Sequence, residues 1–159
     1  MPSMPAGSPS VPGSPAWAVH LPPGLAPDQV NLHEGGSLPG AWMAAWRSDP
    51  GRTVLSTLDG VRVSAAELEE RTAAAARRYA AAGLTPGARV LLSGGTSVEL
   101  IVAYVGALRA GLAVVPANPA YPPAELARLA ATARPELAVL QDPSRLADPS
   151  CAVTTLDLA

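Results

Sequence analysis

The sequence has 159 residues, 48% of them hydrophobic but only 4% aromatic, and it contains neither phenylalanine nor lysine. That is enough apolar material for one domain, whose core would consist of many small side chains that each bury little surface. A formal net charge of −2 without a basic stripe excludes an unassisted binder of the nucleic-acid backbone. The single cysteine, Cys151, excludes an internal disulfide, and we interpret it as a structural or incidental thiol.

Residues 1–27 form a segment rich in proline, serine and glycine. The segment holds eight prolines and no charged side chain, so we expect a tail that is disordered or partly polyproline, followed by a domain over residues 28–159. The prolines interrupt every apolar run that a secretory signal needs. Trp17 and His20 are candidate anchors for a partner, but isolated residues in such an arm are more often unconstrained.

The first expected elements after the tail are a short helix and a hairpin. Trp42 and Trp46 lie one helical turn apart, and Pro50 ends the segment, which favours a helix whose tryptophans dock on the core over a ligand platform. The next stretch, "TVLSTLDGVRVS", has two β-prone runs around Asp59 and Gly60. That pair is a strong signal for a hairpin turn because both residues tolerate positive φ.

A long helix is predicted to begin at Ser64. Ser64 and Glu67 have the spacing of a capping box, Val63 and Leu68 that of a hydrophobic staple, and Gly83 supplies the terminating residue. Its buried face is predicted to consist of Leu68, Thr72, Ala75, Ala76, Tyr79 and Ala82, with Glu67 and Arg71 paired on the other side.

The pattern then alternates between strand and helix. The expected strands are residues 89–93, 112–116 and 137–141, and the expected helices are residues 97–110 and 124–133. Because the strands are continuous apolar runs, we predict an α/β fold with a partial parallel sheet, helices on both faces and right-handed crossovers.

A membrane span is not expected. The most apolar run after the tail, residues 100–116, is broken by Arg109 and Gly111. It divides into a helix and a strand, and neither is long enough to cross a bilayer. A cytoplasmic protein is therefore the prediction.

The stretch "SGGTS", residues 93–97, resembles a phosphate-binding loop between a strand and a helix. It has neither of the usual glycine spacings, and no lysine is present to reach outer phosphates. Thr96 and Glu99 have capping-box spacing, so helix capping is favoured over phosphate binding.

Several other polar residues are candidates for a site. Arg109 and Arg128 are interpreted as solvated or snorkelling rather than as substrate clamps. Asn118 and Tyr121 follow a parallel strand at the edge where ligands bind, although a turn role is favoured. Three acidic residues share one helix without forming an acid–base pair: Glu67, Glu69 and Glu70.

Three stretches, residues 63–92, 97–126 and 126–143, resemble the amino-terminal part of the adenylate-forming superfamily, which includes acyl-CoA synthetases, peptide-synthetase adenylation domains and luciferases. The matching positions include Gly83, Pro86, Gly87, Arg89, Val90, Leu108, Ala110, Gly111 and residues 115–121. The resemblance covers about residues 30–143. Departures at Ala65, Ala66 and Ala88 are local. Asn118 and the later "RPELAVL" look more like an acyl-CoA synthetase than a peptide synthetase.

The resemblance implies a reaction that uses a carboxylic acid, ATP, Mg²⁺ and coenzyme A. It places no catalytic, cofactor-binding or metal residue in this chain, because the family's catalytic motifs lie beyond the matched region. We therefore expect residues 28–159 to be an incomplete AMP-binding domain, the amino-terminal fragment of a fatty-acid or other carboxylic-acid CoA ligase, inactive and without tight cofactor binding by itself.

Two alternatives remain from the sequence. One is a non-catalytic module that completes a sheet with a separately encoded remainder or another protein, and the other is a small nucleotide-binding domain that uses residues 94–97. If the sheet belongs to a larger domain, an apolar strand edge stays uncovered, so self-association is also expected.

Overall fold

A computed structural model describes residues 18, 19, 21, 23–29, 36–146 and 150–156. The chain divides into two units, residues 1–36 and 37–159. In the first unit a 3₁₀ helix, η2, spans Pro27–Gln29. Trp17, His20 and most of the predicted tail lie outside the described residues.

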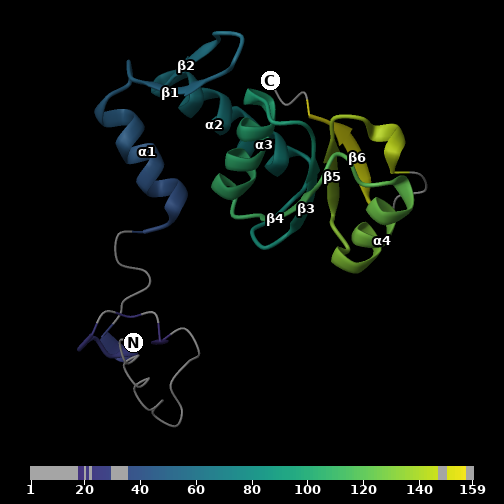
Figure 1. Ribbon diagram of the computed structural model, residues 1–159, viewed down its shortest axis with the longest axis horizontal. Coiled ribbons are helices and arrows are strands. Elements are labelled where there is room, and N and C mark those ends of the chain that lie inside the picture. The colour runs from purple at the N-terminus through teal and green to yellow at the C-terminus, as the bar shows by residue number, and fades with distance from the viewer. Residues whose placement is uncertain (1–17, 20, 22, 30–35, 147–149, 157–159) are drawn as a thin grey trace, which may run out of the picture. The chain divides into compact units, whose positions relative to one another are not determined.

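The second unit begins with a helix, a hairpin and a long helix, and continues as strands alternating with helices (Figure 1). The first four elements are α1 (Leu38–Ser48), β1 (Thr53–Ser56), β2 (Arg62–Ser64) and α2 (Ala65–Ala81). The remaining elements are β3 (Arg89–Ser93), α3 (Val98–Arg109), β4 (Ala113–Ala117), α4 (Pro123–Ala133), β5 (Leu137–Leu140), the 3₁₀ helix η3 (Pro143–Arg145) and β6 (Ala152–Thr155).

The predicted hairpin is confirmed. β1 and β2 pair antiparallel, and Gly60 in the turn has φ +92°, a conformation that glycine adopts without strain. The Thr57 hydroxyl accepts the Val61 N–H at 3.0 Å and closes the turn. Before the hairpin, α1 buries Trp46 at 8% exposure, with Trp42 half-buried beside the same core, so the docking role predicted for this pair is also confirmed.

The larger sheet has four parallel strands in the order β4-β3-β5-β6. From β3 the chain winds to β4 on one side, then crosses back and continues through β5 to β6 on the other. The winding direction therefore changes between β3 and β5, as in doubly wound α/β folds. This confirms the predicted parallel sheet.

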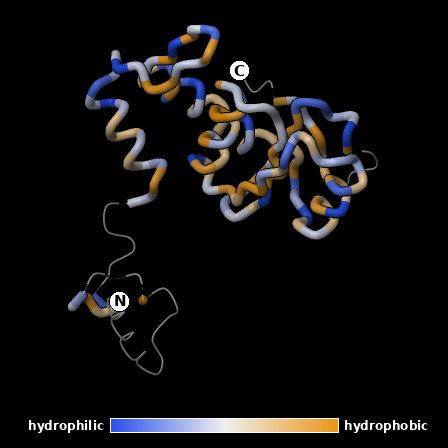
Figure 2. The backbone as a smooth tube through the Cα atoms, in the orientation of Figure 1, coloured by the Kyte–Doolittle hydropathy of each residue, from blue (hydrophilic) through white to orange (hydrophobic). Residues whose placement is uncertain are grey.

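Alternate residues of the strands pack on opposite faces. Val90 and Leu92 belong to the core beneath α2 and α3, whereas Leu91 belongs to a smaller core beneath α4. Figure 2 shows hydrophobic residues along these strands, which is expected when helices cover both faces. Within the described part of the chain, no helix combines the length and apolar character needed to cross a membrane.

Two serine caps fix where the long helices begin. The Ser64 hydroxyl accepts the Glu67 N–H at 3.2 Å, as predicted for α2. At α3 the cap is Ser97, which accepts the Leu100 N–H at 3.1 Å, so the expected Thr96–Glu99 box is wrong by one residue. Ser97 has the extended backbone that a cap requires.

Helices α2 and α3 pack closely because Gly106 of α3 has no side chain. A Cβ added at Gly106 would lie 2.5 Å from the Ala75 Cβ and 3.2 Å from the Thr72 carbonyl oxygen. Nearby, the Tyr79 hydroxyl donates to the Ala103 carbonyl oxygen at 3.1 Å. Most of the predicted α2 face is buried or half-buried, but Ala82 is exposed, because it follows the last helical residue.

Two local features were not predicted. Strand β6 forms a parallel ladder with β5, whereas the last strand expected from the sequence was residues 137–141. Arg134, which ends α4, has φ +47°, a left-handed conformation that an arginine rarely adopts. The other element boundaries agree with the prediction to within about one residue.

Candidate functional site

The carboxyl ends of the parallel strands border a hollow of about 410 Å³. We name it the strand-exit hollow, and it is lined by Ser93, Pro119, Leu126, Leu140, Gln141, Asp142 and Arg145. It lies at the carboxyl ends of the paired strands β3 and β5, between which the winding direction changes, and ligands of open α/β sheets bind outside the carboxyl ends of strands at such a point. It is therefore the candidate site that the fold favours.

The glycine loop at this edge is already tied to its neighbours. Gln141 accepts the Gly95 N–H on its side-chain oxygen Oε1 at 2.8 Å. A Cβ added at Gly94 would lie 2.2 Å from Cδ1 of Leu156, so Gly94 makes room for that leucine. The Gly95 N–H is thus bound to Gln141, and Leu156 packs against the loop at Gly94. Both contacts disfavour binding of an anion by the N–H groups of this loop.

The loop after β4 is held by its own turn and by Arg145. Asn118 accepts the Ala120 N–H on Oδ1 at 2.8 Å, and the Tyr121 N–H donates to the Asn118 carbonyl at 3.1 Å. This is the turn that the sequence favoured at Asn118. The Arg145 guanidinium donates to the backbone carbonyls of Pro119 and Tyr121. Arg145 was not among the residues singled out from the sequence.

Asp142 gives the hollow a negative group. Its Oδ1 accepts from the Ser144 N–H at 3.0 Å and from the Ser144 hydroxyl at 2.6 Å. These hydrogen bonds, with the nearby charge of Arg145, lower the pKa of Asp142 below its usual range. A carboxylate in this position repels an anionic ligand at neutral pH.

These residues do not fit a nucleoside triphosphate. The guanidinium of Arg145 is directed at backbone carbonyls, Asp142 is negative, and the Gly95 N–H is occupied by Gln141. Within the ranges that the structure describes, no cluster of three or more histidine, cysteine, aspartate or glutamate side chains could hold a metal ion. The polar groups of Arg145 and Gln141 hold the loops around the hollow.

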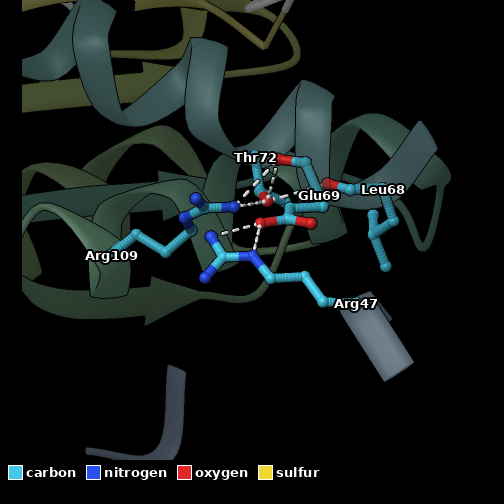
Figure 3. A network of polar contacts seen from close by, with 5 residues as sticks. All are labelled: Arg47, Leu68, Glu69, Thr72 and Arg109. Carbon is cyan, nitrogen blue, oxygen red and sulfur yellow. Dashed lines mark hydrogen bonds and ion pairs between the residues drawn. The ribbon is translucent and has the colours of Figure 1, made fainter. Parts of the chain in front are cut away.

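Arg109 lies away from the hollow, in a polar network between α1, α2 and α3 (Figure 3). It donates to the Glu69 carbonyl oxygen at 2.8 Å and to the Thr72 hydroxyl at 2.7 Å, and Thr72 is fully buried. Burial lowers the pKa of Arg109. Arg109 was expected to be solvated or snorkelling; it is half-buried, and its guanidinium is bound to α2 in the helix interface instead of being fully solvated.

Two glutamates of α2, Glu67 and Glu69, form ion pairs. Glu69 accepts from Arg47 of α1 at 2.6 Å. Arg71 lies 3.8 Å from Glu67, the predicted pair, and 3.3 Å from Glu99 of α3. No acid–base pair was expected among the three glutamates; the Arg71–Glu67 pair lies within α2, whereas Arg47–Glu69 and Arg71–Glu99 join α2 to α1 and α3.

The two remaining candidates lie on other surfaces. Arg128 is exposed on α4. Cys151 is a half-buried free thiol whose pKa is raised by burial, so little thiolate is present at neutral pH.

A sequence model of a family described as AMP-binding enzyme matches residues 42–157. The AMB antimetabolite synthetase AmbB of Pseudomonas aeruginosa is 37% identical over 105 residues, which are 66% of this chain and 8% of AmbB. A linear gramicidin synthase of Brevibacillus parabrevis is 40% identical over 67 residues, which are 42% of this chain and 1% of that synthase.

Among solved structures, the fold is similar to the Klebsiella oxytoca NpsA N-terminal subdomain in complex with 3-hydroxyanthranilyl-AMSN. The TM-score is 0.71 at 20% identity, and the match covers 76% of this chain and 31% of that one. This chain therefore spans only a small part of the curated relatives and under a third of the solved subdomain.

Proposed function

The chain belongs to the AMP-binding enzyme family, and from this premise we propose that it forms the first part of a domain that activates a carboxylic acid with ATP. The observation that carries the proposal is the extent of the family match. Residues 42–157 include the hairpin, the four-stranded sheet and every helix after α1. The similarity thus concerns the whole described sheet unit rather than one motif.

We further infer that the acid is one used by a peptide synthetase. AmbB is named as a synthetase and the Brevibacillus protein as a gramicidin synthase, and they favour an amino or related acid passed to a carrier-protein thiol. They lend no support to the fatty-acid CoA ligase expected from Asn118 and "RPELAVL". That the complete domain uses Mg²⁺, and coenzyme A or a carrier protein as the acceptor of the acid, is likewise a proposal.

In this proposal the described residues supply scaffold and not chemistry. Charge that develops on a transferring phosphoryl group needs cations aimed at it. The sequence has no lysine, Arg109 is bound to α2, and Arg145 is bound to the loop after β4. The purified chain is therefore expected to give no acid-dependent exchange of pyrophosphate into ATP.

A chimera tests the scaffold role. The 105 residues of this chain that match AmbB replace their counterparts in AmbB, and ATP–pyrophosphate exchange is measured beside AmbB and beside the 159-residue chain. We expect exchange from the chimera with the acid preference of AmbB and none from the chain alone. A folded chimera without exchange, or turnover by the chain alone, would contradict the proposal.

The acid class needs a separate measurement. A polypeptide in which this chain is joined to the sequence that adjoins it in its gene is assayed with amino acids, aryl acids and fatty acids. Exchange driven by amino or aryl acids supports the synthetase assignment. Exchange driven by fatty acids alone would restore the ligase expected from the sequence.

A further inference from the structure

The two outer edges of the four-stranded sheet differ in the hydrogen-bond donors that they offer. On β4, the Ala113 N–H donates to the Ala88 carbonyl at 2.9 Å, towards β3. Because backbone N–H and C=O groups alternate in direction along a strand, the backbone groups of Val114 and Pro116 point away from β3, towards the open edge. Proline has no N–H, so the edge of β4 is blunted in the way common to protected edges.

The edge of β6 has no such protection. The Leu156 N–H donates to the Leu140 carbonyl at 3.1 Å, towards β5. By the same alternation, Val153 and Thr155 present their N–H groups outwards. The strand contains neither proline nor a charged residue, and among the described residues no strand pairs with this edge.

The winding of the sheet also points beyond β6. After the change of direction between β3 and β5, successive strands are added outwards, first β5 and then β6. Sequential parallel strands are usually neighbours, and their crossovers keep one hand. A further parallel strand that follows β6 in the chain is therefore expected on its free side, not beyond β4.

We propose that the outer edge of β6, residues Ala152–Thr155, docks a β-strand from the polypeptide that follows these residues in an adenylation domain. This rests on the proposed function. The occupant's backbone carbonyls accept from the N–H groups of Val153 and Thr155, and the sheet grows by one strand. The chain covers 31% of the NpsA subdomain, so polypeptide for the added strand exists in a similar fold.

The test uses two matched variants of the full 159-residue chain, Val153→Pro and Val114→Pro. Both valines are half-buried, both pack against a core, and both point their N–H outwards. Each substitution removes one outward donor and adds a ring at that edge without removing a bond inside the sheet. Val114→Pro is thus the control for general damage to a strand.

Each variant is co-expressed with the stretch of AmbB that begins immediately after its matched residues. Co-purification and the affinity of the pair are measured, together with amide hydrogen exchange at Val153 and Thr155. We expect the wild-type chain and Val114→Pro to form the pair, Val153→Pro to bind about tenfold more weakly or worse, and the two β6 amides to slow their exchange in the pair only.

Three outcomes would overturn the proposal. One is failure of the wild-type chain to form the pair, and another is an equal effect of the two proline variants. The third is a concentration-dependent dimer of the chain alone that Val153→Pro disrupts while the pair stays intact, because the edge would then bind a second copy. None of these readouts depends on ATP–pyrophosphate exchange, so the proposed function can fail or hold independently.

Discussion

The two faces of the four-stranded sheet are built differently. The α2 and α3 face has a thick core that includes Tyr79, and the Thr72–Arg109 network satisfies its buried polar groups. The α4 face has a smaller core around Leu126, and at its carboxyl edge it opens into the strand-exit hollow. The first face is held together by bonds and packing between helices, whereas the second is held together by loop contacts such as those of Arg145.

This contrast indicates which part of the fold carries most of its stability. Close helix packing needs small residues at the contact, as Gly106 shows. The α4 face keeps space, and its polar groups hold the geometry of loops. Stability should therefore depend mainly on the α2 and α3 face, and the following changes test that comparison.

The largest contrast is expected between the two buried anchors, Tyr79 and Leu126. Tyr79→Ala should lower the free energy of unfolding by about 4 kcal/mol, because it leaves a large cavity and removes the buried hydrogen bond to the Ala103 carbonyl. Leu126→Ala should cost about 2 kcal/mol, because its neighbours can relax into the adjoining hollow. Urea unfolding of both variants measures the difference, and equal losses would contradict the comparison.

The next test adds side chains where the chain has none. Gly106→Val should cost about 3 kcal/mol, because its new atoms meet Ala75 and the backbone of α2. Gly94→Ala should cost about 1 kcal/mol, since the atom that it meets is the movable end of Leu156. Thermal unfolding followed by circular dichroism compares them. A larger loss at Gly94 would show that the carboxyl edge is the more rigidly packed region.

A smaller effect is expected from the buried network. Thr72→Val keeps the shape of the side chain but removes the hydroxyl that accepts from Arg109. One acceptor of a part-buried guanidinium is lost, so the free energy of unfolding should fall by about 2 kcal/mol. Thr132→Val on exposed α4, where the hydroxyl donates only to the Arg128 carbonyl, is the matched control and should change little.

The smallest effect concerns pH. Glu136 accepts the Arg89 N–H at 2.6 Å, and this bond lowers its pKa below the ordinary 4.5. Because the folded pKa is the lower one, the stabilisation is present above about pH 4.5 and is lost as the pH falls through the folded value. The urea midpoint should therefore fall less on acidification in Glu136→Gln than in the wild type. An equal fall of the urea midpoint with pH in the two proteins would contradict a stabilising role for the Glu136–Arg89 hydrogen bond.

Local patterns account for most of the fold that the sequence predicted. Ser64 capping, the Asp59–Gly60 turn and the alternation of apolar strands with helices depend on neighbours in the chain. Strand β6 was missed because "AVTT" becomes a strand by pairing with β5 and has no strong pattern of its own.

The site was less predictable than the fold because its contacts join distant residues. Arg145 reaches the loop after β4, and Arg109 reaches Thr72 on another helix. No periodicity in the sequence indicates which carbonyl or hydroxyl accepts a hydrogen bond from a given arginine. The cap of α3 was predicted at Thr96 but lies at Ser97 for a similar reason. The loop before these two residues is bound to Gln141, which is distant in the sequence.

The central position of β3 has a consequence for how the chain is made. Its partners β4 and β5 both come later in the sequence, so a growing polypeptide on the ribosome carries β3 with both edges open until each is synthesised. Leu91, fully buried in the final structure, has no α4 cover until residues 123–133 have also been synthesised. Slow translation before β5 would lengthen the exposure, and the nascent chain would then be a natural client for a chaperone that binds short apolar segments.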